Sequence, residues 1–340
     1  MTQTAALLWG LTAGVLPVFA FLTGLALLDT FRLVRLRQVA EAVAWGGVAA
    51  ALCVGLSRWL FWNPGAEGDW YGMFGAPWVE EAAKAAGLVF LIRTERVAFM
   101  MDAAICGFAA GAGFALVENL VYLELLPGGG IPLFLLRGVG TAVMHGGTTA
   151  IVGVVAIATR RSGPGKSMAM GLVSAIGIHT FWDMGILSPL QASLAVVVGL
   201  PLVFILIFQR SERALQTWMG EKLNQDVEIL EMLDTGKFLE TPAGEYLRSL
   251  NTFPPEVLGD MVCMLQISSE LSAAAKGDRI RIWAGMPEVP DPQLDSKLEE
   301  LEYLNRSIGL AGRHALAPLM PTSSRDRWEL KSLQKSRRGY

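Results

Sequence analysis

Five side chains that can move protons or bind metal ions lie in stretches of sequence that are otherwise apolar. They are Glu80, Glu81, Glu118, His145 and His179. A carboxylate or imidazole inside hydrocarbon costs several kcal/mol unless it is paired or faces water, so such residues are candidates for a functional site. One of them alone is often only a hydrogen-bond partner between helices, but five together need a shared explanation.

The spacing of these residues groups them on helix faces. Glu80 and Lys84 are four residues apart, so we expect Lys84 to hold Glu80 ionised while Glu81 points around the helix. His179 and Asp183 have the same separation, which lets the carboxylate orient the imidazole or join it at a common ligand. Each pair could instead be a structural ion pair without chemistry.

The composition indicates a membrane domain followed by a polar one. Apolar residues make up 52% of the chain and charged residues 17%. The charges are uneven, because residues 1–209 carry 11 Lys/Arg and 11 Asp/Glu, whereas residues 210–340 carry 17 and 20. We therefore expect a transmembrane domain over 1–209 and a second domain over 210–340.

Seven segments are long enough to cross a bilayer, which takes about 20 apolar helical residues. They lie near 5–28, 39–60, 75–92, 99–126, 137–158, 168–187 and 189–208. Basic residues occur in every second connection only, after the first, third, fifth and seventh segments. The sequence thus predicts an all-α, polytopic protein of the plasma membrane, with its N-terminus outside and its C-terminal domain in the cytoplasm.

The expected topology brings the buried polar residues to a similar depth. Glu118 and His179 are each eight residues from the outer end of their segment, which is roughly 12 Å. His145 fits the same layer if its helix begins near Arg137, and Glu80 lies close to the outer rim, just inside Pro77. We expect one shared site toward the outer leaflet.

Four motifs follow one another on successive expected segments. They are Glu80-Glu81-x-x-Lys84, Phe114-x-x-x-Glu118, a lone His145 and His179-x-x-x-Asp183. In this order, over residues 75–187, they resemble the PrsW family of intramembrane proteases, which are relatives of the CAAX prenyl endopeptidase and ABI group. Prenyl endopeptidases typically have EExxxR and FxxxH where this chain has EEAAK and FALVE, so PrsW is the better match.

The resemblance implies a membrane-embedded protease, and peptide hydrolysis needs an activated water and a polarised carbonyl group. Glu80 and Glu81 are the candidate general base. Glu118, His145 and His179 are candidate zinc ligands, with Asp183 orienting His179 or joining as a further ligand. A metal-free site is also coherent, in which the glutamates activate water and both histidines stabilise the oxyanion.

Three other classes of protein remain open. An ion or proton transporter would also bury Glu and His, but no internal repeat is evident in the sequence. The non-catalytic APH subunit of γ-secretase is a distant relative of the fold, so a membrane scaffold is the second alternative. The third is a prenyl-protein (CAAX) endopeptidase, which would have a cytoplasm-facing site.

The partners implied are the lipid bilayer and a single-span membrane protein cut near its outer face, such as an anti-sigma factor, and no nucleic acid. Residues 210–340 lie outside the resemblance. Their pattern predicts helices over Ser211–Leu233, Pro254–Ala275 and Asp291–Ile308, and a disordered or lipid-binding tail over Ser323–Tyr340.

Overall fold

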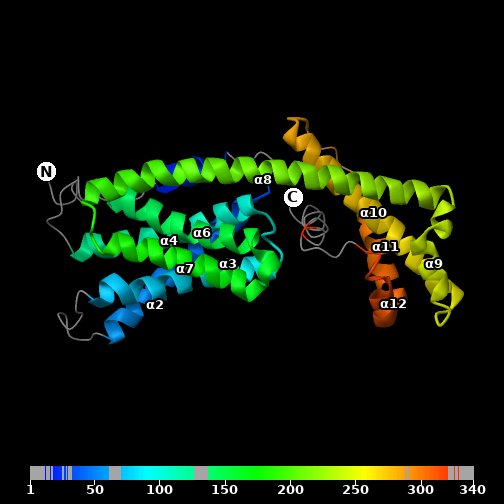
Figure 1. Cartoon of the computed structure of the whole chain (residues 1–340), viewed down its shortest axis with the longest axis horizontal. Helices are drawn as coiled ribbons and strands as arrows, with labels where there is room; N and C mark the ends of the chain where they lie inside the picture. The colour runs from blue at the N-terminus through cyan, green and yellow to red at the C-terminus, as the bar shows by residue number, and fades with distance from the viewer. Residues whose placement is uncertain are drawn as a thin grey trace. The chain divides into compact units, whose positions relative to one another are not determined.

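The computed structural model describes residues 33–60, 70–125, 137–287 and 291–320, with scattered positions outside these ranges. Every regular element among the described residues is a helix, which confirms the all-α fold class. The chain divides into two compact units, Met1–Glu212 and Arg213–Tyr340. Each unit is described by itself below (Figure 1).

The first unit is a bundle of long helices. They are α2 (Leu36–Leu60), α3 (Ala76–Arg93), α4 (Met100–Leu125), α6 (Ala142–Ala158), α7 (Pro164–Asp183) and the first part of α8 (Pro189–Asp234). Two short π-helical turns, Tyr71–Gly75 and Arg137–Thr141, run directly into α3 and α6. Single π-helical turns occur frequently beside functional sites, because they change the direction in which the following side chains point.

Helix α4 forms the centre of this bundle, and α2 and α6 pack closely against it (Figure 1). Every side chain from Met101 to Ala115 is buried. The close approach depends on glycine, since a Cβ atom on Gly111 would lie 2.0 Å from the His145 carbonyl oxygen. A Cβ on Gly46 of α2 would lie 1.8 Å from the carbonyl oxygen of Ala110. Small residues at such crossings bring polar side chains of neighbouring helices within reach of one another.

Four helical segments among the described residues are long and apolar enough to cross a membrane. They are Leu36–Leu60, Met100–Tyr122, Gly138–Ala158 and a stretch within Pro189–Asp234. Helices α3 and α7 coincide with two further expected spans but are not among these four, and they carry most of the charged residues of the motifs. The expected first span, 5–28, is described only at positions 12, 16, 18–24 and 27, so the number of seven spans stays a prediction.

The second unit is also helical and has its own apolar core. It consists of the remainder of α8 with α9 (Pro242–Ser249), α10 (Pro255–Trp283), α11 (Leu294–Ser307) and α12 (Gly309–Leu316). Helices occupy the three expected ranges, and α9 and α12 are additional. Met261, Leu271 and Leu304 lie in the core, and a buried ion pair joins Lys276 Nζ to Asp226 Oδ2 at 2.9 Å. The tail Ser323–Tyr340 lies outside the described residues except for positions 325 and 328.

Candidate active site

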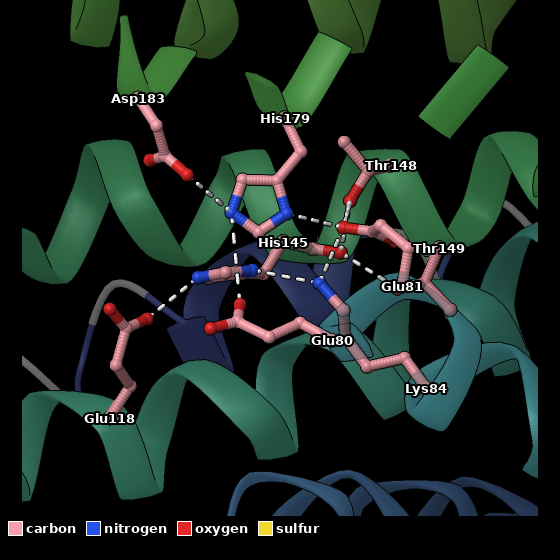
Figure 2. Close-up of polar contacts among 9 residues, drawn as sticks. All are labelled: Glu80, Glu81, Lys84, Glu118, His145, Thr148, Thr149, His179 and Asp183. Atoms are coloured by element: carbon pink, nitrogen blue, oxygen red, sulfur yellow. Dashed lines mark hydrogen bonds and ion pairs between the residues drawn. The ribbon is translucent and has the colours of Figure 1, made fainter. Parts of the chain in front are cut away.

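All seven polar residues of the motifs lie together in the first unit (Figure 2). Helix α3 supplies Glu80, Glu81 and Lys84, α4 supplies Glu118, α6 supplies His145, and α7 supplies His179 and Asp183. Hydrogen bonds and ion pairs connect these side chains across the four helices (Figure 2). The structure therefore brings these seven residues together, although two of the expected pairings differ.

The first difference concerns the partner of Lys84. Its Nζ atom lies 2.6 Å from Oε1 of Glu81, and both side chains are 0% exposed. The expected pair was Lys84 with Glu80. On a helix, residues three and four apart are both within reach, so spacing alone could not choose between the two glutamates. Glu80 instead turns toward a cavity, with 22% of its side chain exposed.

Lys84 also determines how His145 is hydrogen bonded. Its Nζ atom lies 2.8 Å from Nδ1 of His145, and the other ring nitrogen, Nε2, lies 2.6 Å from Oε2 of Glu118. An ammonium group has no acceptor, so Nδ1 accepts the hydrogen bond and Nε2 carries the proton that is donated to Glu118. Figure 2 shows the His145 ring between these two partners, and the Phe114 ring lies 5.0 Å away, centroid to centroid.

His179 has the opposite arrangement. Its Nδ1 atom donates to Oε1 of Glu81 at 2.8 Å. Its Nε2 atom faces two carboxylates, Oδ2 of Asp183 at 3.3 Å and Oε2 of Glu80 at 3.7 Å. The expectation that Asp183 orients His179 agrees with this geometry, and the buried Glu81 adds a second orienting contact that the sequence did not indicate.

Thr148 is a member of the network that sequence reasoning missed. Its hydroxyl donates to Oε1 of Glu81 at 3.0 Å, and the side chain is buried. Thr148 lies three residues after His145, on the same helix face, and that spacing is the signal that could have found it.

A cavity of about 610 Å³ opens beside the network. Its polar wall contains Glu80, Glu118, His145, His179 and Asp183. Tyr71, Met73, Tyr122, Met144 and Trp182 are among the other lining residues. Because Glu81 and Lys84 have no exposed surface, the site has two layers: cavity-facing groups that can contact a substrate, and an inner pair that holds them.

The second difference concerns the candidate metal ligands. Glu80, His145 and His179 each offer one donor atom, and these atoms lie within 4.8 Å of one another. The expected set had Glu118 in place of Glu80, and Oε2 of Glu118 lies 2.6 Å from Nε2 of His145. Two imidazoles and one carboxylate are a donor set that catalytic zinc uses, and they fit a metal ion once Nε2 of His145 has given up its proton and its contact with Glu118.

Comparison with known families agrees with the site. Residues 34–208, slightly more than half of the chain, match the model of the family described as PrsW family intramembrane metalloprotease. A cluster of Glu and His residues inside a bundle of apolar helices is costly and indicates a functional site. The chain belongs to the PrsW family of intramembrane metalloproteases. No curated protein and no solved structure matches it significantly.

Proposed function

We propose that this protein is an intramembrane endopeptidase that hydrolyses a peptide bond of a membrane-anchored protein, using a water molecule activated at Glu80. The observation that carries the proposal is the position of Glu80. Its Oε2 atom lies 3.7 Å from Nε2 of His179, and Glu80 lines the cavity together with both histidines. A carboxylate in a partly enclosed cavity can take a proton from water that is held against it.

The other residues have supporting roles in the proposal. Glu118 accepts the Nε2–H of His145 and fixes this ring at the cavity wall, so a substrate carbonyl oxygen would have to replace Glu118 as the acceptor before His145 could polarise it. Asp183 and Glu81 fix the two edges of the His179 ring. Lys84 compensates the charge of the buried Glu81 and also donates a hydrogen bond to His145. Because Glu81 contacts His179, this connection holds the two histidine rings at a fixed position relative to each other.

Zinc is the metal that this donor set favours. Held by Glu80, His145 and His179, it would supply Lewis acidity to the attacking water and to the carbonyl group. A metal-free site would rely on Glu80 alone to take the proton. Both forms of the chemistry place the water beside Glu80, so both predict that cleavage depends on this residue.

We further propose that the protein is a multi-pass protein of the plasma membrane, with the N-terminus outside and the second unit in the cytoplasm. The charge alternation of the connecting segments supports this orientation. This orientation puts the cavity toward the outer leaflet, so the proposed substrate is a single-span membrane protein that is cut near the outer face of the membrane. An anti-sigma factor is the substrate that the family resemblance suggests.

The alternatives make different demands on the site. A non-catalytic scaffold has no need for a cavity lined by Glu80, Glu118 and two histidines. A prenyl-protein endopeptidase would take its substrate from the cytoplasmic side, against the charge alternation. An ion or proton transporter has internal repeats in many known cases, and none is evident in the sequence.

Comparative membrane proteomics tests the proposal. Cells that express the wild type are compared with cells that express Glu80→Gln, which keeps the side-chain volume and removes the charge. Glu41→Gln is the matched control, because Glu41 lies on α2 in ion pairs with Arg37 and Arg96, away from the cavity. We expect a cleaved membrane protein with the wild type and the control only. The proposal is wrong if cleavage products are the same with Glu80→Gln.

A further inference from the structure

One of the two carboxylate oxygens of Glu81 accepts the hydrogen bonds that hold this side chain in place. Oε1 accepts hydrogen bonds from Lys84 Nζ at 2.6 Å, His179 Nδ1 at 2.8 Å and Thr148 Oγ1 at 3.0 Å. Oε2 is buried and has no hydrogen-bond partner among the described residues. The three donors come from α3, α7 and α6, so this single oxygen atom connects three helices of the site (Figure 2).

The Thr148 hydroxyl has one proton and two acceptors within reach. One is Oε1 of Glu81 at 3.0 Å, and the other is the His145 carbonyl oxygen at 3.1 Å. A carboxylate is the stronger acceptor, because hydrogen bonds to charged groups are shorter and stronger. The neighbouring Thr149 donates to the same carbonyl oxygen at 3.0 Å. The two threonines therefore differ: the Thr148 hydroxyl contacts Glu81, whereas the Thr149 hydroxyl donates to a carbonyl oxygen of its own helix.

We propose that Thr148 is a positioning residue for the peptidase site, acting through Glu81 on His179. The inference rests on the proposed function. Thr148 is buried and does not line the cavity wall that is formed by Glu80 and the two histidines, so it has no direct contact with a substrate there. Its hydroxyl ties Glu81 to α6, the helix of His145. Glu81 in turn holds Nδ1 of His179, which leaves Nε2 facing Asp183 and Glu80.

Loss of the Thr148 hydroxyl removes one of the three donors to Oε1. The remaining donors, Lys84 and His179, lie on α3 and α7, so Glu81 loses the hydrogen bond that ties it to α6. A hydrogen bond to a charged group contributes enough that its removal changes an equilibrium by about tenfold or more. We expect His179 to sample other ring orientations, which lowers the rate of the chemical step and leaves substrate binding nearly unchanged.

Three variants separate positioning from packing. Thr148→Val keeps the shape of the side chain and removes the hydroxyl, and Thr148→Ser keeps the hydroxyl. Thr149→Val is the matched control, because Thr149 is equally buried and its hydroxyl does not contact Glu81. On the substrate found by proteomics, we expect Thr148→Val to lower kcat about tenfold or more with little change in KM. Thr148→Ser and Thr149→Val should stay close to the wild type.

A second measurement does not need a substrate. The chain has three histidines, so histidine-selective ¹⁵N labelling in detergent gives few ring signals. The Nδ1 signal of His179 should shift or broaden in Thr148→Val and be restored in Thr148→Ser. If that signal changes as expected but the wild type cleaves nothing, the positioning of His179 stands and the proposed function fails. An unchanged signal together with unchanged kcat in Thr148→Val, or equal effects of Thr149→Val, would overturn the inference.

Discussion

Nζ of Lys84 lies 2.8 Å from Nδ1 of His145, and this contact decides which nitrogen of that ring carries the proton. The ammonium group can only donate, so the His145 proton is on Nε2, where Glu118 accepts it at 2.6 Å. His179 presents Nδ1 to the Glu81 carboxylate and must carry a proton there. The two histidines of the site are thus protonated on different ring nitrogens.

The first prediction is a difference in tautomer that NMR spectroscopy can measure. In ¹⁵N-histidine-labelled protein from which metal ions have been removed, His145 should have a proton on Nε2 and none on Nδ1, while His179 should have one on Nδ1. The variant His314→Gln removes the third histidine, which is exposed in the second unit, and leaves the two site signals. A proton on Nδ1 of His145 would mean that Lys84 does not donate to this ring.

The second prediction separates the two adjacent glutamates. Glu80→Gln should lower kcat about 100-fold or more, since it removes the group that activates water. Its effect on stability should be small, because 22% of the Glu80 side chain is exposed. Glu81→Gln should also destabilise the fold, by about 3–5 kcal/mol, because it leaves the buried Lys84 ammonium without its charged partner.

Thermal unfolding in detergent, followed by circular dichroism, checks the contrast between these variants. Glu80→Gln should unfold close to the wild-type temperature, and Glu81→Gln well below it. Equal loss of stability in both variants would contradict the division of the site into a cavity-facing layer and an inner pair.

The sequence allowed the motif residues to be assigned to one site, because an ionisable side chain in an apolar helix is costly and must find a partner. The partners themselves were harder to predict. Glu80 and Glu81 are both within reach of Lys84, so the choice depends on how α3 is rotated against α6 and α7, and packing decides that rotation. The same rotation brings Glu80 close to both histidines, so that these three residues form the candidate metal-binding group.

Thr148 shows a different limit of sequence reasoning. It has no charge, and the hydroxyl of a threonine in an apolar helix usually donates a hydrogen bond to a backbone carbonyl oxygen of the same helix, as that of Thr149 does. Only the position of Glu81 on a helix distant in the sequence gives Thr148 its role. Hydropathy alone does not give the number of membrane spans, since the charged residues of α3 and the polar residues of α7 keep both helices out of the four most apolar segments.

The third prediction concerns metal content. Purified active protein should contain about one zinc ion per chain, as expected for a catalytic site with three protein ligands. His179→Asn should lose the ion, since the amide side chain does not replace Nε2. Elemental analysis of both proteins measures this, with Glu41→Gln as the control. Active wild type with well under one ion per chain would favour the metal-free chemistry at Glu80.

The fourth prediction tests the orientation in the membrane. Ser188 is exposed between α7 and α8, and Ser162 is exposed between α6 and α7. Cys53 and Cys106 are buried, so Cys263→Ala gives a background with little reactive thiol. In this background, Ser188→Cys should react with an impermeant thiol reagent on intact cells, and Ser162→Cys should react only after lysis. The reverse labelling would place the cavity toward the cytoplasm.

The central claim is tested most directly by purified protein that is reconstituted into vesicles with its membrane-protein substrate. Mass spectrometry of the products follows cleavage by the wild type, Glu80→Gln and Glu41→Gln. We expect the wild type and Glu41→Gln to produce the same two fragments, with one new carboxyl terminus and one new amino terminus, and Glu80→Gln to leave the substrate intact. Fragments from Glu80→Gln at the wild-type rate would contradict the assignment of Glu80 as the water-activating residue.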